Sequence, residues 1–179
     1  LIGMRRERMF RLAGEVDDGD PRNLEAQAAR LYWKKLFSNA FKRDRESKGI
    51  NQFLNYGYAI VRSCILRSVL VHGLHPGLGI HHSNSRNPYK LVDDLMEPFR
   101  PFVDIAVRNL NIDSDEDINP DQKAYLVNQI YKDVTNRVKT TNLWNAINEL
   151  LDSFVNVITV GEIDFAYSIS IADTVVIDQ

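Results

Sequence analysis

The sequence is poor in the features that mark secreted and membrane proteins. It contains one cysteine, Cys64, which excludes a disulfide framework and a multi-cysteine zinc site within the chain. No apolar run approaches the roughly 20 residues needed to span a bilayer, and no signal-peptide pattern opens the chain. These absences favour a reducing, cytoplasmic setting and no role in a membrane.

The charges nearly balance, with a formal net charge of -2, yet they are unevenly spread. Residues 30–48 hold seven basic residues against two acids, Asp44 and Glu46. A positive segment of this kind can hold the phosphates of a polyanion, and Lys42, Arg43 and Arg45 are its candidate DNA-binding residues. A solvated face remains the alternative interpretation, because charge runs usually have that role.

Apolar spacing predicts a mainly α-helical protein. The expected helices cover the opening residues 1–16, then 24–37, 51–72, 88–110, 120–138 and 142–158. Asn23 is the expected N-cap of the second helix, and Pro98 and Pro101 should interrupt the fourth just after Glu97. We expect residues 1–158 to form one helical domain. Residues 159–179 alternate like a strand without a partner and are expected to form an extended or partly disordered tail.

All four histidines lie within eleven positions, at 72, 75, 81 and 82, and three acidic residues follow on an expected helix. The turn-rich segment GLHPGLG should end the preceding helix and present His81 and His82 from a loop. Asp93 and Asp94 each lie within one helical turn of Glu97. Imidazole nitrogen beside carboxylate oxygen is a typical set of metal ligands.

Four segments resemble a known family in the same order: GDPRNLEAQAARLYW, INQFLNYGYAIVRSCILRS, GLHPGLGIHH and KLVDDLMEPFRPFVD. They are similar to the C-terminal helical domain of the CRISPR spacer-acquisition integrase, the first-numbered CRISPR-associated protein, in its type II form. Family members carry a β-rich domain ahead of the helical one. Because the chain opens at Leu1 in an expected helix, that domain is expected to be missing from this sequence.

The resemblance implies a set of site residues. By analogy with the family, Glu25, His82 and Glu97 hold a divalent ion and carry the catalysis, with His81 competing with His82 for the ligand position. Asp94 matches an acidic position that supports the site or belongs to a second metal. Oxygen ligands with one nitrogen suit Mg²⁺ or Mn²⁺. Arg100 joins Lys42, Arg43 and Arg45 as a candidate DNA-binding residue.

The implied function is that of a metal-dependent DNA endonuclease and integrase, which inserts spacers into a CRISPR array in the prokaryotic cytoplasm. The implied partners are prespacer and repeat DNA, a second copy of the full-length protein, and a small ferredoxin-like CRISPR-associated protein. This segment alone is expected to be weakly active or inactive. A noncatalytic helical DNA-binding or scaffold module is the main alternative. A zinc hydrolase is disfavoured, because the sequence lacks HExxH and cysteine ligands.

Overall fold

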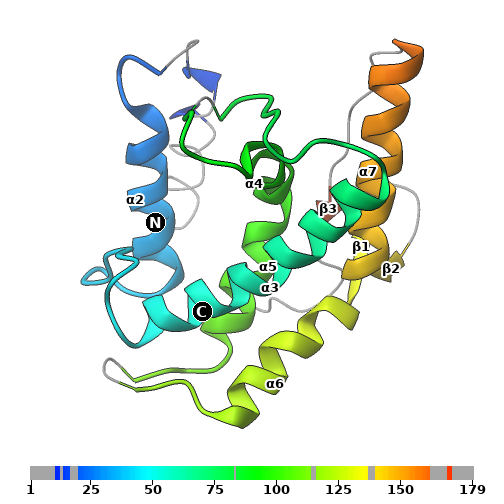
Figure 1. Ribbon diagram of the computed structural model, residues 1–179. Helices are drawn as coiled ribbons and strands as arrows, with labels where there is room; N and C mark the ends of the chain where they lie inside the picture. Colours follow the sequence, from blue (N-terminus) through cyan, green and yellow to red (C-terminus); the bar gives the residue numbers. More distant parts are fainter. Residues whose placement is uncertain are drawn as a thin grey trace. The chain divides into compact units, whose positions relative to one another are not determined.

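The computed structural model describes residues 11–12, 14–16, 20–82, 84–113, 116–136, 140–161 and 169–170. The chain divides into two compact units, Leu1–Ser47 and Lys48–Gln179. The protein is mainly helical, as the apolar spacing predicts (Figure 1). Of the expected opening helix, residues 11, 12 and 14 are helical, and residues 1–10 and 13 lie outside the described part. The expected domain boundary at residue 158 stays a prediction.

The first unit contains helix α2, Leu24–Leu36, which confirms the helix expected from residue 24. Asn23 does occupy the N-cap position, but its side chain makes no capping hydrogen bond, and its φ is 54°. The carboxylate of Asp20 caps the helix instead, because it accepts hydrogen bonds from the main-chain N–H groups of Leu24 (2.7 Å) and Glu25 (2.9 Å). The side-chain cap expected of Asn23 was therefore wrong.

An aromatic cluster folds the loop after α2 back against the helix end. The ring centroids of Trp33 and Phe41 are 5.8 Å apart, and those of Phe37 and Phe41 are 4.8 Å apart. Stacked and tilted aromatic pairs at these separations stabilise local structure. Lys42 and Arg43 follow Phe41 directly and Arg45 comes two positions later, so this cluster lies where the loop part of the basic segment begins.

The second unit is built around helix α3, Ile50–Val71 (Figure 1). Four helices contact it: α4 (Lys90–Met96), α5 (Arg100–Arg108), α6 (Pro120–Asn128) and α7 (Leu143–Val160). Phe53, Leu54, Ile65 and Val69 of α3 are fully buried at 0% exposure. The helix expected at residues 51–72 is therefore confirmed, and it forms the centre of the core.

The helical stretch after residue 88 breaks where its two prolines occur. A 3₁₀ turn, η1 (Glu97–Phe99), separates α4 from α5. Pro98 stands in the first two positions of η1, and Pro101 stands in the first two positions of α5. At these positions the missing N–H of proline costs no helical hydrogen bond. The interruption predicted just after Glu97 is confirmed.

The single helix expected over residues 120–138 was wrong. Helix α6 ends at Asn128, a 3₁₀ turn η2 (Gln129–Tyr131) follows, and the chain then forms strands β1 (Asp133–Asn136) and β2 (Thr140–Asn142). The residues Val134, Thr135, Thr140 and Thr141 are β-branched, which favours strands over helices. Val134 is buried at 1% exposure, so its apolar character reflects sheet packing rather than a helix face.

The described part of the tail has a strand partner, contrary to expectation. Strand β3 (Ile169–Ser170) pairs antiparallel with β1, which gives the sheet order β2-β1-β3. Helix α7 continues to Val160 and ends at Gly161, whose φ of 75° suits a glycine C-cap. Residues 162–168 and 171–179 lie outside the described part. No described helix is both long and apolar enough for a membrane crossing.

Candidate functional site

The side chain of Asp94, on α4, gathers the loop that carries the paired histidines. Its Oδ2 accepts hydrogen bonds from the main-chain N–H groups of Ile80 (2.5 Å) and His81 (3.1 Å). Its Oδ1 accepts from the main-chain N–H of His82 at 3.1 Å. One carboxylate thus takes three successive backbone donors, and the loop is fixed to the helix at the position of the histidines.

The same carboxylate orients the His82 ring. The distance from His82 Nδ1 to Asp94 Oδ1 is 2.5 Å, and the Asp94 side chain is 6% exposed. A carboxylate accepts from Nδ1 only when that nitrogen carries the proton, so a neutral His82 has its lone pair on Nε2. The His82 side chain is 38% exposed, which leaves the imidazole accessible to a ligand. A carboxylate behind a histidine is the usual support of a metal-binding imidazole.

Asp94 stays ionised at neutral pH. Burial would raise the pKa of its carboxyl, but the hydrogen bonds from the His82 ring and from the three main-chain N–H groups together lower that pKa below its ordinary value. The negative charge therefore persists behind the imidazole and holds the ring in its orientation.

The turn that leads into the histidines requires glycine at position 79 because of space. A Cβ built on Gly79 would lie 2.6 Å from the carbonyl oxygen of His82 and 2.7 Å from Cβ of Lys90. The chain can make this close approach only without a side chain. The turn around Pro76 is attached to α4 by a separate hydrogen bond, in which the N–H of Leu91 donates to the carbonyl of Pro76 at 2.9 Å.

Asp93 forms an ion pair with Arg62 of α3. Its carboxylate accepts from Arg62 Nε (2.7 Å) and Nη2 (3.0 Å) and from Asn87 Nδ2 (2.7 Å). Burial would raise the pKa of Asp93, but these hydrogen bonds and the Arg62 charge lower it. The Arg62 guanidinium also lies 4.9 Å from the ring centroid of Tyr89. This pairing links α3 to the start of α4.

Glu97 lies at the helix break and faces solvent more than the other two acids do. Its side chain is 53% exposed, and its Oε1 accepts a hydrogen bond from Arg100 Nε at 3.0 Å. Arg100 lies in turn 5.2 Å from the ring centroid of Tyr58. The Tyr58 hydroxyl donates to Asp104, which is buried at 2% exposure. Glu97 is therefore accessible as an anionic ligand and already has one cationic partner.

The remaining histidines have structural contacts. His72 binds the carbonyl of Ser68 through Nδ1 (2.7 Å) and the Asp152 carboxylate through Nε2 (2.9 Å), which links α3 to α7. The Nδ1 of His75 accepts from the N–H of Gly77 at 3.1 Å within the turn. The ring of His81 stands edge-on to that of His82, with centroids 6.0 Å apart. Among the described histidines, only His82 has its ring hydrogen-bonded to Asp94.

Glu25, the third expected ligand, is exposed in the first turn of α2. It belongs to the first unit, whereas His82 and Glu97 belong to the second. Within the described part of the chain, no three His, Cys, Asp or Glu side chains form a group that could hold a metal ion. The joint role of Glu25, His82 and Glu97 therefore stays a prediction.

The basic segment forms a loop with its own internal turn. Asp44 accepts hydrogen bonds from the N–H of Glu46 (3.0 Å) and the hydroxyl of Ser47 (2.8 Å). These two hydrogen bonds, followed by the charges of Lys42 and Arg43, lower the pKa of Asp44. Lys42 and Arg45 are exposed, and Arg43 is half-buried. The loop thus presents cations around a local turn.

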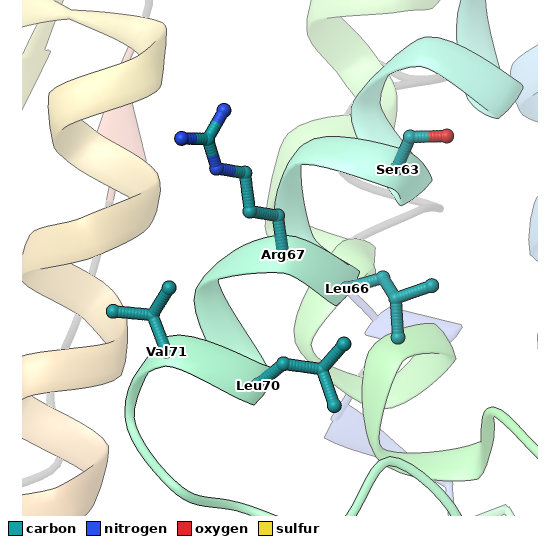
Figure 2. Close-up of a pocket in the computed structure, with 5 residues that line it drawn as sticks. All are labelled: Ser63, Leu66, Arg67, Leu70 and Val71. Atoms are coloured by element: carbon teal, nitrogen blue, oxygen red, sulfur yellow. The ribbon is translucent and has the colours of Figure 1, made fainter.

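An open apolar groove lies elsewhere, along the C-terminal half of α3 (Figure 2). Its lining residues are Ser63, Leu66, Arg67, Leu70 and Val71. Leu70 and Val71 are 57% and 75% exposed, and Arg67 lies 5.6 Å from the Trp144 ring centroid. The groove contains no carboxylate or imidazole, so it is not the candidate metal site.

Sequence reasoning missed the contacts that cross between helices. Arg62 and Asp93 are 31 positions apart, and Tyr58 and Asp104 are 46 positions apart. Both pairs depend on how α3 packs against α4 and α5, which spacing along one helix does not reveal. Tyr58 has a packing role, because its hydroxyl donates to Asp104 and its ring lies against the Arg100 guanidinium.

Fold and geometry together define a helical domain that presents an oriented, accessible histidine next to acidic side chains. The model of the family described as CRISPR associated protein Cas1 matches residues 10–146. The chain therefore belongs to the Cas1 family.

Named relatives agree with this assignment. The chain is 34% identical over 150 residues to a CRISPR-associated endonuclease Cas1 of Neisseria meningitidis, a match covering 83% of this chain and 49% of the relative. It is 30% identical over 143 residues to a Cas1 of Saccharolobus solfataricus, covering 74% of this chain and 39% of the relative. The chain thus spans about half the length, or less, of these relatives.

A solved structure shares the fold. The structure described as a casposase bound to integration product has a TM-score of 0.66 to this protein at 22% identity. The match covers 82% of this chain and 52% of the casposase. At this level of identity the likeness shows a common helical architecture.

Proposed function

We propose that this chain is the metal-binding helical part of a CRISPR spacer-acquisition endonuclease and integrase. The observation that carries the proposal is the hydrogen bond from His82 Nδ1 to Asp94 at 2.5 Å, which turns Nε2 into the ligand-binding nitrogen. Membership of the Cas1 family supports the same conclusion, because its named relatives are endonucleases.

The available donors suit a hard divalent cation. His82 offers one neutral nitrogen, and Glu97 and Glu25 offer carboxylate oxygens, a set that fits Mg²⁺ or Mn²⁺. Bound to these three residues, such an ion would supply electrophilic stabilisation of the charge that develops on a scissile phosphate. Asp94 would keep the His82 ring in the ligand tautomer throughout.

The reaction is an in-line displacement at a DNA phosphorus. A 3′ hydroxyl attacks, a new P–O bond forms, and the bond to the leaving 3′ oxygen of the target strand breaks. Attack by water instead of a 3′ hydroxyl gives cleavage. Lys42, Arg43 and Arg45 would hold the backbone phosphates on either side of the reacting group.

Spacer insertion involves more than this chain. Prespacer DNA and repeat DNA are the proposed substrates in the prokaryotic cytoplasm. A second copy of the full-length protein and a small ferredoxin-like CRISPR-associated protein are the proposed partners. The support is family membership, and the relatives are about twice as long as this chain. Two active sites at a fixed spacing would raise the effective concentration of the second DNA end.

The experiment measures nicking of supercoiled plasmid by the full-length protein with Mn²⁺, Mg²⁺, Zn²⁺ or EDTA. Nicking that needs Mn²⁺ or Mg²⁺ and disappears in His82→Ala, but not in His81→Ala, supports the proposal. Loss of activity in His81→Ala alone would move the ligand to His81. DNA binding without nicking in any metal would favour the noncatalytic scaffold, and activation by Zn²⁺ alone would favour a zinc hydrolase.

A further inference from the structure

Among the described residues, Arg100 is the only hydrogen-bond or ion-pair partner of the exposed Glu97 carboxylate. The two side chains are three positions apart, and the Glu97 side chain is 53% exposed. An ion pair open to solvent is weak, since water and salt screen the attraction. A divalent cation held by further ligands would therefore displace the guanidinium from Glu97 at little cost.

The displaced guanidinium would not swing freely. It lies 5.2 Å from the ring centroid of Tyr58, a distance at which a cation is attracted to an aromatic face. The Tyr58 hydroxyl donates to the buried carboxylate of Asp104, so the ring itself is fixed. The Arg100 side chain is 29% exposed. The cation therefore stays close to the position where Glu97 would bind metal.

We propose that Arg100 is an exchangeable cation: it neutralises Glu97 before metal binding, then turns its fork of N–H donors to a DNA phosphate when Glu97 becomes a metal ligand. This inference rests on the proposed function, in which Glu97 holds the ion and the chain binds DNA. A guanidinium suits the second role, because it matches phosphate oxygens with two parallel hydrogen bonds. No covalent bond changes in the exchange.

The first test measures Mn²⁺ binding to this chain by calorimetry. Arg100→Ala should tighten Mn²⁺ binding about two- to fivefold, the equivalent of one surface ion pair lost by the metal-free state. Arg108→Ala is the matched control, since it removes the same charge from the other end of α5, about 12 Å along the helix axis. Unchanged or weaker Mn²⁺ binding in Arg100→Ala would overturn the exchange.

The second test needs no metal and follows DNA binding. Glu97→Gln should release Arg100 and steepen the slope of log K against log salt by about 0.9, the value for one extra neutralised phosphate. Adding Arg100→Ala to Glu97→Gln should cancel that change. Two outcomes would overturn the role of Arg100 at phosphate. In one, Glu97→Gln leaves the slope unchanged; in the other, the steeper slope of Glu97→Gln persists after Arg100→Ala is added.

The two tests separate this inference from the proposed function. If the wild-type chain binds Mn²⁺ and DNA but the Arg100 and Glu97 variants behave like Arg108→Ala, the exchange is contradicted and the proposed function is not. A wild-type chain that binds neither Mn²⁺ nor DNA overturns the proposed function, and the exchange with it. Thermal unfolding of each variant checks that the helices remain folded. With Arg100→Lys in place of Arg100→Ala, part of the steeper slope of log K against log salt should remain, because lysine keeps the charge but lacks the paired N–H donors of the guanidinium.

Discussion

Asp94 holds both the backbone and the ring of His82: its Oδ1 lies 3.1 Å from the His82 main-chain nitrogen and 2.5 Å from Nδ1. The distances mean that loop position and ring orientation depend on a single carboxylate. A change at Asp94 should therefore alter metal binding more than it alters the global fold.

Asp94→Asn tests that dependence. The amide keeps the size of the side chain, but its NH₂ group is a donor that would face main-chain N–H groups, so at least one backbone hydrogen bond is lost. We expect Mn²⁺ affinity, measured by calorimetry, to fall about 10- to 100-fold. Asp93→Asn is the control, because it weakens the Arg62 pair while leaving the loop hydrogen bonds intact. Equal losses in both variants would argue against a special role of Asp94.

The basic loop makes a separate prediction about DNA. Replacing Lys42, Arg43 and Arg45 together by alanine should weaken binding to every DNA sequence about equally, because phosphates carry no sequence information. The slope of log K against log salt should flatten by roughly three. A control triple variant, Arg108, Lys123 and Lys132 to alanine, removes the same charge from the second unit. If both triple variants flatten the slope equally, general charge rather than this loop governs binding.

Periodic apolar spacing predicted most of the helices, since burial of a helix face is a local pattern. The break after Glu97 followed from two prolines, whose effect is equally local. Spacing failed at Val134, where an apolar residue in a helical register lies in a strand. Its β-branched neighbours gave a signal for the strand that the helical period obscured.

In the candidate site, too, the sequence predicted local features but not the contacts between helices. The motifs named His82, Asp94 and Glu97, and the structure adds what Asp94 contacts. Pairs such as Arg62 with Asp93 and Tyr58 with Asp104 join separate helices, so no spacing in the chain announces them. The approach of Glu25 to the other two residues is a tertiary relationship of this kind, and it stays a prediction.

The His72 contact predicts a pH-dependent link between α3 and α7. The hydrogen bond to the Ser68 carbonyl raises the pKa of His72; burial opposes this, and the hydrogen bond and charge of Asp152 raise it further. A raised pKa in the folded state means that the stabilisation is fully present below the unfolded pKa of about 6.5 and is lost as pH rises through the folded value.

The check is urea unfolding of wild type and His72→Gln between about pH 5.5 and 9, a range that brackets the ordinary histidine pKa. Wild type should exceed the variant in stability at the acidic end by about 0.3–1 kcal/mol, the usual value of a cation at a helix C-terminus. The difference should shrink towards the alkaline end. A difference between wild type and His72→Gln that stays constant across this pH range would contradict the prediction.

The last prediction concerns the contact that brings α3 and α5 together. A Cβ built on Gly57 would lie 2.5 Å from Cγ1 of Val103, which is closer than two carbon atoms can approach without a shift. Val103 is buried at 5% exposure, so its side chain has little room to give way. Alanine in mid-helix is otherwise better than glycine by about 1 kcal/mol. The overlap between the new Cβ and Val103 costs about 1–3 kcal/mol, which outweighs this gain. We therefore expect Gly57→Ala to lower the stability of the protein.

Urea unfolding of three variants separates the two effects. Gly57→Ala should be less stable than wild type, and Gly57→Ala with Val103→Ala should be more stable than the sum of the single changes implies, since the second change removes the overlapping methyl groups. Ser63→Ala, on the exposed side of α3, serves as the control for substitution in this helix. A Gly57→Ala protein as stable as wild type would mean that the overlap with Val103 costs no more than the roughly 1 kcal/mol gained in the helix, and it would contradict the prediction.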